Sequence, residues 1–161
     1  MAVETIGFGG GCHWCTEAVF AALKGVGRVE QGFIRSKPPD DGWSEAVRLG
    51  FDPDEIDRDV LIEVHLRTHA STSNHSMRGK YRSAVYVVDG AQGEAVRAAL
   101  GRLQAGFERP LVTRVLSLGA FRASAEPFRN YHEKQAGGPF CTRYIDPKLA
   151  QLRRDFAAHV R

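Results

Sequence analysis

Cysteine is scarce in this chain, with three residues among 161. So few thiols, in an odd number, exclude the disulfide scaffold of a small secreted protein and favour a reducing compartment. The apolar runs are all too short to cross a membrane. The N-terminal residues also lack the basic and apolar segments of a signal peptide. We therefore expect a cytoplasmic protein that does not contact a membrane.

Clustered charge is missing as well. The 22 basic and 19 acidic residues give a net charge of only +3 and are mixed along the chain, so nothing favours nucleic-acid binding. No glycine-rich phosphate loop has the spacing of a nucleotide site, and we expect no cofactor. Internal repeats and linkers are absent too. With 43% hydrophobic residues, the length suits a single domain over residues 1–161, which we expect to be a monomer.

Strand-like and helix-like segments alternate along the chain, which predicts an α+β fold. The order βαββαβ with added pieces indicates a ferredoxin-like core in a two-layer sandwich, with a mixed sheet and a C-terminal extension. Asp52 as N-cap and Pro53 at the next position mark the start of the second helix. The expected strands are 2–8, 27–35, 44–51, 81–88 and 111–118, and the expected helices are 12–24, 53–67 and 92–105, followed by short helices.

The most informative stretch is Gly9-Gly10-Gly11-Cys12-His13-Trp14-Cys15. A short strand leads into it and good helix formers follow, so Cys12 is expected at the first turn of a helix. Free backbone N–H groups and the positive end of the helix dipole stabilise a thiolate there. The glycines permit a tight turn and keep side chains away from the thiol. The pattern predicts a nucleophilic cysteine.

Cys12 and Cys15 form a C-x-x-C pair with three open interpretations: a redox dithiol, half of a metal site, or one working thiol beside a buried one. Structural zinc sites normally use paired ligands at short spacing, and no second C-x-x-C exists. Free cysteine is commonly buried, so inward packing of Cys15 is favoured and no metal is expected. On paper, a zinc site would still find further ligands in Cys141, His65, His69 and His132.

Cys141 is distant in sequence from the other two cysteines. It ends the segment Gly137-Gly138-Pro139-Phe140-Cys141, whose glycines allow movement. We expect this segment to swing toward Cys12, so that Cys141 acts as a resolving cysteine. A passive surface thiol is the alternative.

Glu45 stands out on the strand 44–51. Period-two alternation places it on one face with Trp43, Val47 and Leu49. A carboxyl group on an apolar face keeps its proton to a higher pH than one in water, which suits a general acid. The alternative is a strand-end glutamate that reaches solvent.

Four further residues lie near these motifs in the sequence. Trp14 either belongs to the core or forms the wall of an apolar pocket beside the thiol. Tyr81 either orients a polar substrate with its hydroxyl or is an ordinary strand aromatic. His75 and Ser76 precede it in the long polar loop 68–80, where such residues are more often solvated than catalytic, although long loops frequently carry function.

Taken in order, these motifs resemble the type-A peptide methionine sulfoxide reductases. Residues 9–17 are similar to the family's Gly-Cys-Phe-Trp signature, and residues 44–53 to its acid-bearing strand. Residues 80–84 resemble its Gln-Tyr-Arg-Ser segment, and residues 139–149 its C-terminal resolving-cysteine region. Each match is short, but the matches follow the family's order and span nearly the whole chain.

The resemblance implies reduction of the S epimer of methionine sulfoxide, peptide-bound or free, with thioredoxin as the reductant. It implies that Cys12 attacks the sulfoxide sulfur and becomes a sulfenic acid, which condenses with a thiol to a disulfide. Cys141 would be that thiol. Glu45 would protonate the sulfoxide oxygen with help from the Tyr81 hydroxyl. Trp14 would hold the methyl group of the substrate.

Several positions depart from the family's pattern. His13 replaces a pocket phenylalanine, and Phe33 stands where a substrate-binding tyrosine is usual. The aspartate usual before the Tyr-Arg-Ser segment is missing, and we expect His75 or Ser76 to take its place at the substrate. Cys15 replaces a small residue and competes for the role of resolver. The chain is therefore expected to be a divergent member.

The same cysteines leave two other functions open. A C-x-x-C pair at a helix start suits a thiol–disulfide oxidoreductase, although the proline-bearing strand signals of a thioredoxin-like fold are missing. The pair together with the histidines also suits a non-enzymatic zinc or oxidant-sensing module.

Overall fold

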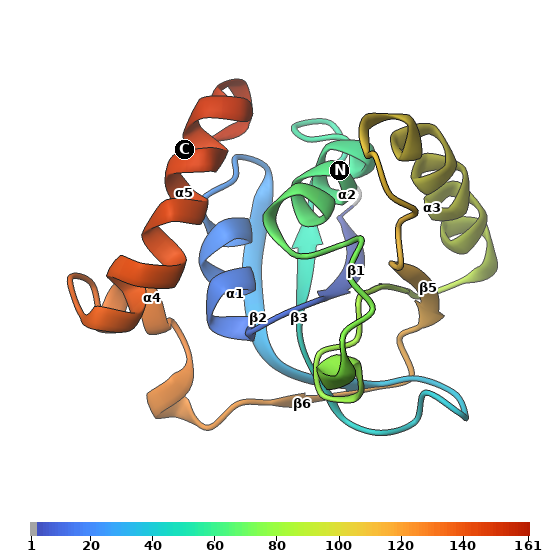
Figure 1. Cartoon of the computed structure of the whole chain (residues 1–161), viewed down its shortest axis with the longest axis horizontal. Coiled ribbons are helices and arrows are strands. Elements are labelled where there is room, and N and C mark those ends of the chain that lie inside the picture. The colour runs from blue at the N-terminus through green and yellow to red at the C-terminus, as the bar shows by residue number, and fades with distance from the viewer. Residues whose placement is uncertain (1–2) are drawn as a thin grey trace.

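A six-stranded mixed sheet runs through the protein, seen here in a computed structural model that describes residues 3–161 (Figure 1). Its strands lie in the order β5-β4-β1-β3-β2-β6. The strands are β1 (Glu4–Gly9), β2 (Val26–Arg35), β3 (Ser44–Phe51), β4 (Ala84–Val87), β5 (Arg114–Ser117) and β6 (Ala120–Ala123).

Three helices, α1 (His13–Ala21), α2 (Arg58–Thr68) and α3 (Gly90–Leu103), connect the strands. The chain ends in α4 (Tyr131–Lys134), a π-helical turn (Cys141–Ile145) and α5 (Asp146–Asp155), which lie beside α1 in Figure 1. Short 3₁₀ turns cover Ser76–Gly79, Gln104–Gly106, Glu126–Phe128 and Ala157–His159.

Within the four central strands β4-β1-β3-β2, each adjacent pair is antiparallel. This is the ferredoxin-like arrangement, with α1 and α2 as its crossover helices. β5 adds to β4 in the parallel direction, which makes the sheet mixed, and β6 adds antiparallel to β2 at the opposite edge. The predicted fold class is confirmed.

Alternation along the strands separates two cores. On β3, Val47 and Leu49 belong to the large cluster that includes residues of α1, α2 and α3, whereas Ala46 belongs to a smaller cluster. Tyr86 of β4 joins Ala46 in this smaller cluster. Because successive strand residues point to opposite faces, Glu45 lies on the helix-covered face with Val47.

The expectation of only short helices after residue 118 is wrong, because Ala120–Ala123 forms β6. This strand has four residues, and none of them is fully buried, so it carries no period-two signal. Pairing with β2 stabilises it, and Gly32 allows the approach: a Cβ there would lie 2.9 Å from the Phe121 ring.

The expected start of the second helix at Pro53 is also wrong. The Asp52 side chain accepts a hydrogen bond from the Asp54 N–H at 2.9 Å and closes a local turn instead. The chain then becomes extended at Asp57, which is the N-cap of α2. A capping residue followed by proline therefore marked a turn here, one turn before the helix.

Within residues 3–161, none of the helices has the length and apolar character needed to span a membrane.

Candidate active site

Cys12 lies at the N-cap of α1, as predicted. The Cys15 thiol donates a hydrogen bond to it and, with the backbone N–H groups of Trp14 and Cys15, lowers the pKa of Cys12 below its ordinary value. Burial and the Glu45 carboxylate oppose this shift. The same hydrogen bond, together with burial, raises the pKa of Cys15 far above its ordinary value. Cys12 is thus the more acidic thiol of the pair, and Cys15 is the hydrogen-bond donor.

Two histidines support the glycine turn before Cys12: His65, which is buried in α2, and His69, the partly buried residue that follows the helix. The Nε2 atom of His65 lies 2.8 Å from the Gly9 carbonyl oxygen, and the two imidazole rings stack with centroids 4.1 Å apart. The His69 ring packs against Gly10 so closely that a Cβ there would collide with it. Gly11, by contrast, has open space where a Cβ would be, which leaves the approach to Cys12 free. The glycines therefore serve both packing and access.

Both imidazoles are held neutral. Burial lowers the pKa of His65 and lowers the pKa of His69 to about 4. An unfolded chain binds a proton at a histidine near pH 6.5, whereas folded His69 does not until pH 4. The contribution of His69 to the free energy of unfolding is therefore fully present above pH 6.5. It is lost as the pH drops from 6.5 to 4.

We expect the free energy of unfolding to fall by about 2 kcal/mol through His69 alone between pH 7 and pH 4.5. Urea unfolding at both pH values measures this loss. The variant His69→Gln serves as the matched control and should lose less stability over the same interval, because glutamine does not titrate. An equal loss in both proteins would contradict the prediction.

Glu45 is 8% exposed and lies on the face of β3 toward α1, as the alternation predicts. It does not reach solvent as a strand-end glutamate would. Its Oε1 accepts a hydrogen bond from the backbone N–H of His13 at 3.1 Å. The start of α1 thus brings this carboxyl group beside the nucleophile.

The ring of His13, which is 7% exposed, contacts residues of both β2 and β3. Its Nδ1 is 2.6 Å from the Gly32 carbonyl oxygen, and its Nε2 is 3.5 Å from Oε1 of Glu45. The ring also meets Phe33 edge-on, with centroids 5.2 Å apart. The structure therefore brings His13, Phe33, Glu45 and Cys12 together in one site.

Tyr81 reaches this site through Lys80, a residue that the sequence reasoning did not select. The Nζ atom of Lys80 lies 3.7 Å from Oε2 of Glu45 and 5.1 Å from the Tyr81 ring centre. Interactions with Tyr81 and with the Glu45 carboxylate raise the pKa of Lys80. The family's Gln-Tyr-Arg-Ser segment has a glutamine where this chain has Lys80. This difference was the sequence signal that could have identified Lys80 as a residue of the site.

His75 and Ser76 are exposed, and no hydrogen bond among residues 3–161 joins either to Cys12 or Glu45. The His75 ring instead accepts from the Met77 N–H at 3.2 Å and caps a 3₁₀ turn. Their role at the substrate stays a prediction.

The contact between this loop and the glycine turn comes from Arg78. Its guanidinium donates to the carbonyl oxygens of Gly10 at 3.0 Å and Tyr81 at 2.9 Å, and to two further carbonyls of its own loop. Arg78 therefore fixes the loop against the start of the active site. Its position in a polar loop gave no signal of this role.

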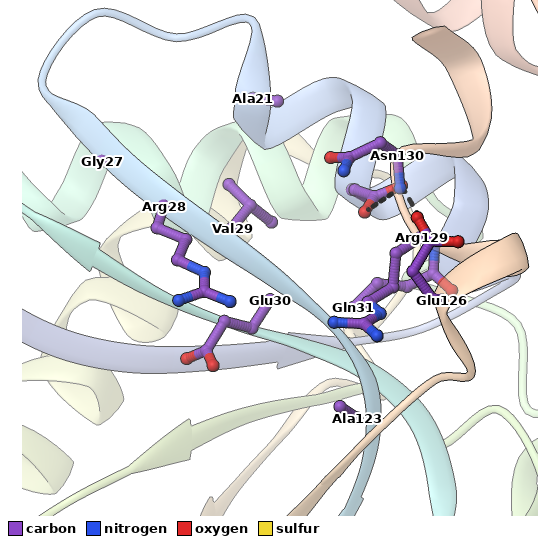
Figure 2. Close-up of a pocket in the computed structure, with 11 residues that line it drawn as sticks. Ala21, Gly27, Arg28, Val29, Glu30, Gln31, Ala123, Glu126, Arg129 and Asn130 are labelled. Atoms are coloured by element: carbon purple, nitrogen blue, oxygen red, sulfur yellow. Dashed lines mark hydrogen bonds between the residues drawn. The ribbon is translucent and has the colours of Figure 1, made fainter. Parts of the chain in front are cut away.

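Trp14 is covered by the C-terminal part of the chain. Its ring stacks on Tyr131 at a centroid distance of 3.9 Å and meets Phe140 edge-on at 5.1 Å. The buried carboxylate of Glu17 holds this segment in place, because it accepts from the backbone N–H groups of Asn130 at 2.9 Å and Tyr131 at 3.1 Å. Figure 2 shows Asn130 and Arg129 of this segment beside Gln31 of β2. Trp14 is thus neither in the main core nor free at the thiol.

Cys141 is fully buried in the π-helical turn, packed with Cys15, Ile145 and Leu149. Cys141 is therefore not the surface thiol of the alternative interpretation. Ile145 and Leu149 pack the turn against α1, and the expected movement of this segment toward Cys12 stays a prediction. Burial raises the pKa of the Cys141 thiol. Both Cys12 and Cys15 contact this cluster, so the three thiols share one apolar region.

The histidines and cysteines do not gather into a metal site. Within residues 3–161, no group of three or more His, Cys, Asp or Glu side chains has a geometry that could hold a metal ion. His65 and His69 are engaged with the glycine turn and His132 with Asp146, at 3.1 Å. The ligands that a zinc module would need are thus committed elsewhere.

Comparison with known proteins fits this arrangement. A sequence profile of the peptide methionine sulfoxide reductase family matches residues 4–160. The peptide methionine sulfoxide reductase MsrA of Chromobacterium violaceum is 35% identical over 92% of this chain and 94% of its own length.

Two solved structures of Mxr1 from Saccharomyces cerevisiae share the fold. The reduced form has a TM-score of 0.76 at 18% identity and covers 84% of this chain and 87% of its own. The complex of Mxr1 with Trx2 has a TM-score of 0.64 at 16% identity, over 77% and 82% of the two chains. On its sequence match along nearly its whole length, the chain belongs to the peptide methionine sulfoxide reductase family.

Proposed function

We propose that this protein reduces methionine-S-sulfoxide, peptide-bound or free, to methionine by thiol chemistry, with thioredoxin as the reductant. The observation that carries the proposal is the position of Cys12 at the N-cap of α1, with the Cys15 thiol hydrogen-bonded to it and the Glu45 carboxyl group buried beside it. Membership of the family supports the same reaction.

In the first step, the Cys12 thiolate attacks the sulfoxide sulfur. Glu45 gives a proton to the sulfoxide oxygen, and the S–O bond breaks as that oxygen passes to Cys12. The products are methionine and a sulfenic acid on Cys12. Two electrons move from the Cys12 sulfur to the substrate sulfur, so no cofactor is needed. Tyr81 would assist the same proton transfer, which its contact with Lys80 beside Glu45 supports.

In the second step, a thiol condenses with the sulfenic acid to form a disulfide and water. We place Cys15 first in this role, because its thiol is hydrogen-bonded to Cys12 in the folded protein. Cys141 lies in the same apolar cluster and is fully buried, so it needs a movement of the π-helical turn to reach Cys12. Its role as the resolver stays a prediction that the variants in the Discussion test.

Reduction of this disulfide by thioredoxin completes the cycle. Mxr1 has the same fold as this chain, and its complex with Trx2 supports a partner of this kind. All three cysteines are free thiols, which suits the reducing environment of the cytoplasm.

The deciding experiment is reduction of the separate S and R epimers of a blocked methionine sulfoxide with a dithiol reductant. We expect turnover of the S epimer only. Absence of turnover with either epimer would refute the proposed function. Turnover of the R epimer would refute the assigned stereochemistry.

Glu45→Gln is expected to slow the first step at pH 7 by about 100-fold, the usual contribution of a general acid. Glutamine keeps the shape and accepts the hydrogen bond from His13, but it has no proton to give. Methionine formed in a single turnover, without reductant, measures this step alone. A loss of less than about threefold would mean that another group supplies the proton.

A further inference from the structure

We propose that His13 and Glu45 hold one proton between them and act together as the acid that protonates the sulfoxide oxygen. The proposal rests on the proposed function and names a second member of its acid. His13 stands where the family's Gly-Cys-Phe-Trp signature has a phenylalanine.

The Gly32 carbonyl fixes the state of the imidazole. A carbonyl oxygen only accepts, and it lies 2.6 Å from Nδ1 of His13, so Nδ1 carries a hydrogen. The other nitrogen, Nε2, faces Oε1 of Glu45 at 3.5 Å. A neutral ring presents a lone pair there and needs a donor, which a protonated Glu45 supplies. A charged ring donates there, and an ionised Glu45 accepts.

Burial selects the state with one shared proton. The residues are 7% and 8% exposed, so an uncompensated charge on either is costly. Without the shared proton, the pair carries a lone carboxylate, and with a second proton it carries a lone imidazolium. With one proton, the pair is neutral overall, whichever of Glu45 and His13 holds it.

Three other titratable or charged groups lie near the pair on the surrounding elements: Lys80, Arg122 and Cys12. Lys80, on the loop before β4, is 3.7 Å from Oε2 of Glu45 but is 58% exposed at its side chain, so solvent screens it. Arg122 of β6 lies over the neighbouring Phe33 ring at 5.2 Å. Both cations favour loss of the shared proton.

Cys12 of α1 acts in the opposite direction. The Glu45 carboxylate opposes ionisation of Cys12, so the thiolate and the shared proton favour each other. The reactive state, with a thiolate on Cys12 and one proton on the pair, is thereby stabilised. When the thiolate attacks, that proton moves to the sulfoxide oxygen and ends on the sulfenic acid. The pair is left with one negative charge and regains its proton from water.

Two variants separate the proton from the other contacts of His13. His13→Asn keeps a side-chain N–H for the Gly32 carbonyl but does not titrate. His13→Phe keeps an aromatic ring against Phe33 and restores the family's residue. We expect both to lower the midpoint of the alkaline limb of the single-turnover pH–rate profile by about one pH unit relative to the parent protein. His159→Asn, at an unrelated position, should leave the profile unchanged.

An unchanged alkaline midpoint in both His13 variants would overturn the proposal. Such a result would leave the proposed function standing, because the parent protein would still turn over the S epimer.

A second readout does not depend on activity. In the ¹⁵N spectrum of the parent protein, Nδ1 of His13 should stay protonated while Nε2 titrates, and Glu45→Gln should shift that titration by about one pH unit. An identical His13 titration in the parent protein and in Glu45→Gln would overturn the proposal, even if the protein reduced no sulfoxide.

Discussion

Cys12→Ser is expected to abolish the formation of methionine from methionine sulfoxide, with a loss of at least about 10⁴-fold. A serine hydroxyl stays protonated where the Cys12 thiol ionises, and it is a poor nucleophile toward sulfur. It also cannot form a sulfenic acid or a disulfide. Methionine released from the S epimer with excess dithiol reductant measures the effect.

The substitution is small and lies at a helix N-cap, where serine is a favoured residue. We therefore expect the fold to survive, which urea unfolding of the variant at pH 7 checks. A rate within tenfold of the parent protein would mean that Cys12 is not the nucleophile, and the mechanism would fail as a whole. If Cys15 takes over the attack in Cys12→Ser, the remaining rate should disappear when Cys15→Ser is added to that variant.

Cys15→Ser is expected to release one equivalent of methionine per chain and then to lose thioredoxin-driven turnover by about 100-fold or more. Serine still donates a hydrogen bond to Cys12, so the first step persists. It provides no thiol to condense with the sulfenic acid. Methionine counted with and without thioredoxin, and a sulfenic-acid trap on Cys12, measure the two stages separately.

Cys141→Ser is the matched comparison, since it removes a thiol from the same apolar cluster. If Cys15 resolves the sulfenic acid, this variant should recycle at a rate close to that of the parent protein. Recycling that survives in Cys15→Ser and fails in Cys141→Ser would instead restore Cys141 as the resolver. The π-helical turn would then have to open during catalysis, because Cys141 is fully buried in the structure.

Cys15→Ala separates the second role of this residue. The hydrogen bond from the Cys15 thiol is the largest cause of the lowered pKa of Cys12. Alanine removes that donor, whereas serine retains one. The acidic limb of the single-turnover profile should therefore move to higher pH in Cys15→Ala and move less in Cys15→Ser. This pair distinguishes stabilisation of the thiolate from resolution of the sulfenic acid.

The sequence by itself determined the features that depend on neighbours along the chain. Glycines followed by helix formers put Cys12 at a helix N-cap, and alternation put Glu45 on the helix-covered face of β3. The order of strands and helices predicted the ferredoxin-like core. Local periodicity encodes these features because backbone geometry repeats every 2 residues in a strand and every 3.6 in a helix. The resemblance to the family predicted the reaction, which is the reduction of methionine sulfoxide.

Only the tertiary structure decided which distant residues meet. His13 and Glu45 are 32 positions apart, and their contact depends on how α1 packs on β2 and β3. The burial of Cys141 and the covering of Trp14 depend on the anchoring of the C-terminal helices against α1. No local pattern marks these contacts, because their free energy comes from packing between elements rather than from the conformation of one segment. The sequence predicted that Cys12 and Glu45 are the reacting groups. Packing between elements determined that His13 lies beside Glu45 and that the Cys15 thiol lies within reach of Cys12.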